Sequence, residues 1–173
     1  FFPSKNLGAY GDGGAVFTSS DEYAAKIAAM ANHGMVKKYH YDYVGINSRL
    51  DTLQAAILDV KLKYLDQYND RRAAAADRYD KALRDIPGII IPKKKSWSTH
   101  IYHQYTLRVT GNKRDSLKEY LAEHKIPSMI YYPLGLHLHK AYIDLGYRKG
   151  NFPVTDKVSQ EVLSLPMHSD LTE

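Results

Sequence analysis

The sequence predicts an α+β arrangement in which a small sheet and its helices follow a long helical region. Apolar residues recur at helical spacing from Leu50 to about residue 83, and the pattern stops at Pro87-Gly88. Short apolar segments typical of strands follow, at 89–91, 101–109 and 128–131. Helical patterns occupy 113–124 and a stretch near 155–163, after a loop rich in Pro, Gly and His. The resulting order, β, β, α, β, loop, α, is typical of a small α+β unit.

The residues before the long helical region predict a strand, a glycine-rich bend and a helix. Residues 15–18 have the composition of a short buried strand. Ser20 or Asp21 is a suitable cap for a helix across 21–33, which Gly34 would end. Residues 35–46 are rich in tyrosine and are expected to be irregular, and Ser48 is a candidate cap for the next helix. Because that helix would exceed the usual globular length, we expect it to bend.

Composition limits the class of protein. The chain has 173 residues, no cysteine and a net charge of +5, so disulfides and thiolate metal sites are excluded. The charge suits either an anionic partner or a lysine-rich solvated surface, and Lys93–Lys95 is the tightest basic run, read as a surface turn. No apolar run approaches the ~20 residues of a membrane span, and no signal peptide is visible, so the expected compartment is the cytoplasm.

Two motifs carry the functional prediction. Phe2-Pro3-Ser4-Lys5-Asn6-Leu7-Gly8, followed by Gly11–Ala15, places a lysine between an extended segment and a glycine-rich loop. By spacing alone, a surface lysine beside an ordinary loop is the preferred interpretation. Gly45-Ile46-Asn47-Ser48-Arg49-Leu50-Asp51 is the second motif, and weaker matches follow at 102–105, 131–134 and 163–168. Together they resemble the DegT/DnrJ/EryC1/StrS aminotransferase family over nearly the whole chain.

The resemblance implies an α/β fold of the fold-type I pyridoxal 5′-phosphate (PLP) transferases, related to aspartate aminotransferase. It implies a homodimer with shared active sites, which moves an amino group from glutamate to a UDP- or dTDP-linked ketosugar in amino-sugar or polysaccharide biosynthesis. Lys5 matches the lysine that forms the Schiff base with the cofactor and later moves a proton. Asn47 matches a residue that reaches the cofactor phosphate of the partner subunit, although its local sequence also suits a loop before a helix.

The remaining site candidates depend more heavily on the resemblance. Tyr131 and Tyr132 match positions where relatives place sugar- or nucleotide-contacting side chains. Arg49 is a candidate substrate contact that would serve a nearby anion, with a salt bridge to Asp51 or elsewhere as the alternative. His33, together with His40 and His103, is a candidate polar contact at the site or an ordinary loop histidine. His137 and His139 would share one face of an extended segment, but no further ligand completes a metal set, so no metal site is expected.

The resemblance also implies the domain limits. Residues 1–50 would end the large PLP-binding domain, 51–86 would form a long bent linking helix, and 87–173 would form a small C-terminal α+β domain. Complete members of the family are about twice as long, so we expect this segment alone to be inactive. A non-catalytic fragment or a binding module of the same fold is the alternative. Lys5 argues against the family's dehydratases, which have histidine there, and no signature of nucleic-acid binding is present.

Overall fold

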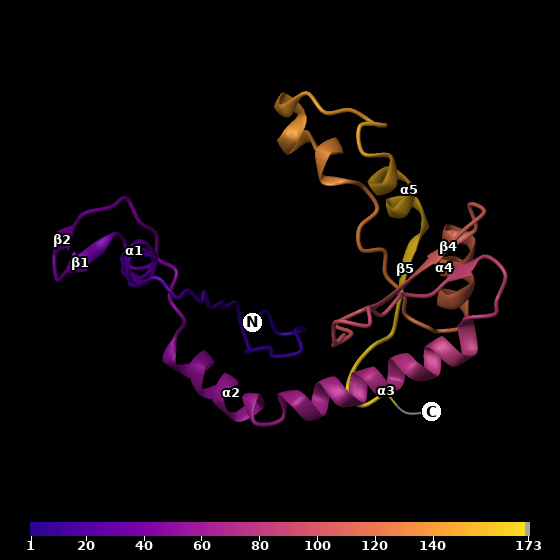
Figure 1. Cartoon of the computed structure of the whole chain (residues 1–173), viewed down its shortest axis with the longest axis horizontal. Coiled ribbons are helices and arrows are strands. Elements are labelled where there is room, and N and C mark those ends of the chain that lie inside the picture. The colour runs from indigo at the N-terminus through magenta and orange to yellow at the C-terminus, as the bar shows by residue number, and fades with distance from the viewer. Residues whose placement is uncertain (172–173) are drawn as a thin grey trace. The chain divides into compact units, whose positions relative to one another are not determined.

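The computed structural model describes residues 1–171 and divides the chain into two compact units, Phe1–Asp66 and Gln67–Glu173. Figure 1 shows the elements of both units in chain order, from indigo to yellow. The division falls inside helix α3 (Leu65–Leu83). The expected domain limits at residues 50 and 86 stay predictions. Within residues 1–171, no helix combines the length and the apolar character that crossing a membrane requires.

The first unit contains two helices and a small hairpin. These are α1 (Asp21–Ala31), β1 (Met35–Lys37), β2 (His40–Tyr41) and α2 (Thr52–Leu62). Helix α1 begins as expected, because the Ser20 hydroxyl accepts the Tyr23 amide and acidic residues occupy the first turn. Just after α1, Gly34 has a φ of +83°, a conformation that glycine adopts easily.

Three expectations for this unit were wrong. Residues 15–18 are extended but exposed and form no strand, because no described segment supplies a hydrogen-bonding neighbour. The stretch 35–46 contains the antiparallel β1–β2 hairpin, which the irregular tyrosine-rich sequence concealed. The cap of α2 is Asp51 and not Ser48, and its side chain makes no capping hydrogen bond.

The long helical region, for which a bend was expected, is interrupted between α2 and α3, and the bend itself stays a prediction. Helix α2 ends at Leu62 and α3 begins at Leu65, with a turn in which the Tyr64 amide donates to the Lys61 carbonyl. Figure 1 shows α2 and α3 as separate helices joined at this turn.

The second unit is built around a three-stranded antiparallel sheet. Its elements after α3 are β3 (Ile89–Ile90), β4 (Tyr105–Val109), α4 (Arg114–Glu123), the 3₁₀ helices η1 (Leu136–Leu138) and η2 (Lys140–Leu145), α5 (Pro153–Glu161) and β5 (Val162–Leu165). Strand β4 lies between β3 and β5. In the β4–β5 register Leu107 is opposite Leu163, and the two chain segments are more than fifty residues apart in sequence.

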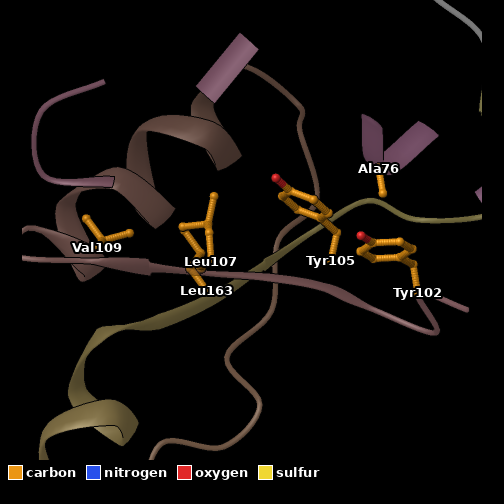
Figure 2. Close-up of a cluster of buried hydrophobic side chains, with 6 residues drawn as sticks. All are labelled: Ala76, Tyr102, Tyr105, Leu107, Val109 and Leu163. Atoms are coloured by element: carbon orange, nitrogen blue, oxygen red, sulfur yellow. The ribbon is translucent and has the colours of Figure 1, made fainter. Parts of the chain in front are cut away.

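The core of this unit lies where β4 and β5 meet α3. Alternate β4 side chains are buried, as the period of two requires for a half-covered strand. Figure 2 shows the cluster, which consists of Ala76, Tyr102, Tyr105, Leu107, Val109 and Leu163, none of them more than 4% exposed. Burying a side chain such as Leu107 stabilises the unit by about 1.5–3 kcal/mol.

The guanidinium of Arg72 and the hydroxyl of Tyr105 are polar groups at this core, and each has partners. The guanidinium of Arg72 donates through Nη1 to the carbonyls of Tyr102, His103 and Met167. Burial lowers the pKa of Arg72. The Tyr105 hydroxyl donates to Asp80 at 2.6 Å, and burial together with this bond raises the pKa of Tyr105. Both groups tie α3 to the segment that contains β4.

Sequence reasoning located β3, α4 and α5 but misplaced the strands that depend on distant partners. Strand β4 begins at Tyr105, not at residue 101, because Tyr102 has a φ of +42°. The strand expected over 128–131 is reduced to a single bridge between Met129 and Ser164. The last helix ends at Glu161, and the residues after it form β5, which was not expected.

Candidate functional site

The loop that carries Lys5 is a closed turn anchored to helix α2. The Lys5 amide donates to the Phe2 carbonyl, and a Cβ on Gly8 would lie 2.4 Å from the Pro3 carbonyl oxygen, so only glycine fits there. Lys61 donates to the Gly8 carbonyl at 2.5 Å, and Gln54 accepts the Tyr10 amide at 2.8 Å. The backbone around Lys5 is therefore held at several points.

The Lys5 side chain is exposed on this anchored turn. Within residues 1–171, no hydrogen bond or ion pair engages its ammonium group. An amine that is free to react on a fixed backbone fits a lysine that must reach an aldehyde carbon. The sequence prediction missed the two anchoring residues, Gln54 and Lys61. Their separation of seven residues places them on one face of a helix, and this spacing was the available signal.

The segment with Asn47 is held against the end of α1. The Ile46 amide donates to the Met30 carbonyl, the Ser48 amide donates to the Ala31 carbonyl, and Asn47 forms a bridge with Asn32. This segment comes close to the end of α1 because two glycines are in contact: a Cβ on Gly45 would lie 2.1 Å from the Gly34 nitrogen. The second motif therefore requires glycine for packing and presents Asn47 at a defined place.

Arg49 orients the side chain of Asn47. Its Nε donates to Oδ1 of Asn47 at 3.0 Å, which leaves the amide NH₂ group as the free donor of this exposed side chain. The ion pair between Arg49 and Asp51 that the sequence allowed does not form among the described residues. A cation and an oriented amide donor side by side are suited to binding an anion such as a phosphate.

Asn47 and Arg49 line a cavity of about 1070 Å³ in the first unit. Its other walls are the glycine-rich segment 12–18 and the face of α1 with Ala24, Ile27, Ala28 and Ala31. Lys5 and His33 are not among its lining residues, and His33 has a φ of +62° in the turn after α1. The structure thus brings Asn47 and Arg49 together and leaves Lys5 and His33 outside this cavity.

Tyr131 and Tyr132 line a second cavity, of about 630 Å³, within the second unit. Their rings meet edge to face with centroids 5.7 Å apart. Residues 133–136 and His139 continue the same wall, and α5 supplies the opposite wall with Val154, Thr155, Val158 and Ser159. Aromatic rings and a few polar groups in a mainly apolar cleft suit a flat or ring-shaped ligand.

The remaining histidines do not gather into a metal site. The expected extended segment with His137 and His139 is instead a 3₁₀ turn, η1, so the two side chains do not alternate along a strand. In the described part of the chain, no group of three or more His, Cys, Asp or Glu side chains is placed to hold a metal ion. His40 is exposed on β2, and His103 lies in the second unit, where its carbonyl accepts from Arg72.

Several known proteins are similar to this chain in sequence. A "Pleiotropic regulatory protein" of Geobacillus stearothermophilus is 45% identical over 100% of this chain and 46% of its own length. The UDP-2-acetamido-2-deoxy-3-oxo-D-glucuronate aminotransferase of Pseudomonas aeruginosa is 44% identical over 97% of this chain and 45% of its own length.

Solved structures are similar to this chain in fold. DesV of S. venezuelae, in complex with a ketimine intermediate, has a TM-score of 0.95 and 38% identity over 100% of this chain and 46% of its own. NtdA of Bacillus subtilis, with bound cofactor PMP, has a TM-score of 0.88 and 30% identity over 98% of this chain and 40% of its own. The expected fold, part of a fold-type I transferase, is confirmed.

The family model for the DegT/DnrJ/EryC1/StrS aminotransferases matches residues 1–173. The chain spans about half the length of the curated relatives it matches, at 46% and 45% for the two named above. The chain belongs to the DegT/DnrJ/EryC1/StrS aminotransferase family.

Proposed function

We propose that this chain is the lysine-bearing part of a PLP-dependent aminotransferase that moves an amino group from glutamate to a nucleotide-linked ketosugar. The observation that carries the proposal is the anchored turn of Lys5, whose ammonium group has no partner among residues 1–171. The relatives named as transaminases of UDP- and dTDP-linked sugars support it. The segment alone would not transaminate, because the rest of a PLP site must come from elsewhere in the protein.

Lys5 has two tasks in this proposal. Its amine would hold the cofactor through the cofactor's aldehyde group, and when free it would act as the acid and base that moves a proton to or from the substrate carbon. Bound PLP supplies the electron sink that makes removal of that proton feasible. The fixed backbone around Lys5 keeps the amine within reach during both tasks, because Gly8 and Tyr10 are tied to α2.

Asn47 and Arg49 would hold the cofactor phosphate of a partner subunit in a homodimer. The Asn47 amide NH₂ is a neutral donor, and Arg49 both orients it and adds positive charge. The cavity they line in the first unit contains exposed Val16 and Phe17, the latter 92% exposed. We propose that residues 1–50 belong to a large PLP-binding domain whose other part covers this apolar surface.

The substrate would be a UDP- or dTDP-linked 3-keto or 4-keto hexose, with its sugar ring against Tyr131 and Tyr132. The cavity at these rings is mainly apolar, which suits the apolar face of a hexose. His33 stays a predicted contact. Residues 51–86 would link the domains and residues 87–173 would form the small domain. Cytoplasmic location and the absence of nucleic-acid and membrane partners stay predictions.

A non-catalytic protein of the same fold is the second candidate. It is favoured by the relative named "Pleiotropic regulatory protein", which is 45% identical to this chain. Such a protein could keep the fold and the motifs without turnover. The two candidates differ in what happens when the Lys5 amine is removed.

The decisive experiment is Lys5→Ala in the complete protein, with Lys63→Ala as the matched control. Lys63 is an exposed lysine of α2's C-cap that pairs with Asp59 at 3.6 Å. Lys5→Ala should abolish the visible absorbance of the PLP Schiff base and lower amino transfer from glutamate by ~10²–10⁴-fold. A panel of nucleotide-ketosugars with product mass measurement reads both the turnover and the substrate. Unchanged turnover in Lys5→Ala would refute the proposal, and Lys63→Ala should retain both signals.

A further inference from the structure

A buried pair of ionisable side chains lies beside the cavity at Tyr131 and Tyr132 without lining it. His137, in η1, is 8% exposed, and Asp156, in the first turn of α5, is 11% exposed. Nε2 of His137 lies 3.2 Å from Oδ1 of Asp156. Neither atom has a hydrogen bond with good geometry to any described residue. Each therefore depends on the other for its polar contact.

The imidazole of His137 is also fixed by packing. The Phe152 ring meets the His137 ring edge to face, with centroids 4.8 Å apart. The Tyr147 ring in turn meets the Phe152 ring edge to face, with centroids 5.2 Å apart. A Cβ on Gly135 would lie 2.8 Å from Cε1 of His137. Glycine at 135 thus leaves the room that the imidazole occupies against the backbone.

Asp156 is fixed through its second oxygen. The Gly150 amide donates to Oδ2 of Asp156 at 2.6 Å, so the carboxylate joins the loop before α5 to the pair. The same Gly135 Cβ would lie 2.9 Å from Cγ2 of Thr155, which shows how closely the loop approaches α5 here. The pair therefore connects two segments of the second unit that are nineteen residues apart.

These two segments are also the two walls of the cavity of about 630 Å³. Residues 131–136 and His139 form one wall, and α5 forms the other through Val154, Thr155, Val158 and Ser159. His137 and Asp156 connect these two segments but are not among the residues that line the cavity. If the pair were lost, a buried carboxylate oxygen would lack its neighbour, and the wall would have to move to admit water.

We propose that His137 and Asp156 are positioning residues that set the spacing between the Tyr131–Tyr132 wall and α5. They act through Tyr131 and Tyr132 and do not touch the ligand. The nature of that ligand, the sugar part of the substrate, rests on the proposed function. The spacing itself does not, since it follows from contacts within the second unit.

The test uses the complete protein with His137→Leu, His137→Gln and Asp156→Asn, and with His124→Gln as control. His124 is an exposed histidine on the C-cap of α4, outside the cavity. Glutamine keeps an N–H donor near the position of Nε2, whereas leucine removes it. The readouts are amide hydrogen exchange of peptides spanning 131–139, and KM and kcat for the ketosugar.

His137→Leu should accelerate exchange across 131–139 and raise KM about tenfold while kcat stays within about twofold, because ground-state positioning is lost. His137→Gln should keep the exchange rate and KM close to the wild-type values, and His124→Gln should match the wild type in both. If His137→Leu does not fold, Asp156→Asn provides the same two readouts. Wild-type exchange and KM in Asp156→Asn and in any folded His137→Leu would overturn the inference. Absence of amino transfer in the wild type would refute the proposed function alone, because the exchange measurement needs no substrate.

Discussion

Replacing Arg72 by methionine tests how the second unit is held together. Arg72 is 9% exposed on α3, and its Nη1 donates to the carbonyls of Tyr102, His103 and Met167 at 3.2, 3.3 and 3.1 Å. Methionine keeps an unbranched apolar side chain of similar reach and removes the guanidinium. Three carbonyl oxygens on two different segments then lose a charged donor.

The expected loss of stability follows from these contacts. A hydrogen bond to a charged group contributes about 1.5–3 kcal/mol, but here one nitrogen serves three acceptors, so the contributions do not add in full. Burial lowers the pKa of Arg72 from its usual value, so the charge also carries a desolvation cost that methionine avoids. We therefore expect Arg72→Met to lower the free energy of unfolding by about 3 kcal/mol.

The neighbouring Arg71 is the matched control. It pairs with Asp170 at 3.2 Å, but the side chains are 49% and 74% exposed, so solvent screens the pair. Arg71→Met should cost no more than about 1 kcal/mol. Urea unfolding of the complete protein, followed by near-ultraviolet circular dichroism of the buried tyrosines, compares the two variants. If Arg72→Met is within about 1 kcal/mol of Arg71→Met, the three carbonyl contacts do not stabilise the unit as argued.

Two further predictions concern alkaline pH and a glycine contact. Burial and the bond to Asp80 raise the pKa of Tyr105, so its stabilisation is complete below the unfolded pKa of about 10 and is lost as pH rises towards the folded pKa. Above pH ~10, this group should lower the free energy of unfolding of the wild type by up to ~1.4 kcal/mol per pH unit. In urea titrations at several pH values, the free energy of unfolding of Tyr105→Phe should decline less steeply with pH. Parallel slopes for the two proteins would contradict this prediction. Gly45→Ala should destabilise by about 3 kcal/mol or more, because its Cβ would lie 2.1 Å from the Gly34 nitrogen. Gly14→Ala, whose Cβ meets nothing within 4 Å, should unfold thermally like the wild type, and equal effects of the two alanines would argue against the contact.

The elements that sequence predicted well are those with local signals. Helix α1 has its cap at Ser20, acidic residues in its first turn and Gly34 shortly after its end, and all of these act within one or two turns. The length of the helical region predicted only a bend, and the structure divides the region into α2 and α3. Helix α4 and strand β3 also appear where their apolar patterns place them.

The strands that sequence misplaced depend on partners far along the chain. Strand β5 continues directly from α5, and its apolar residues extend the helical pattern, so only pairing with β4 identifies it. Residues 15–18 have the composition of a strand, yet no described segment pairs with them. Strand formation requires a neighbour, and composition does not state where that neighbour is.

For the candidate site, the sequence predicted which chemical groups to consider. The family resemblance of the two motifs singled out Lys5 and Asn47, because spacing alone left Lys5 readable as a surface lysine, and their roles stay predictions. Only the tertiary structure decided how these groups are held: Lys61 anchors the loop of Lys5, and Arg49 turns the amide of Asn47. The His137–Asp156 pair was likewise beyond the sequence, because a contact between residues nineteen positions apart exists only after the loop and α5 have packed together.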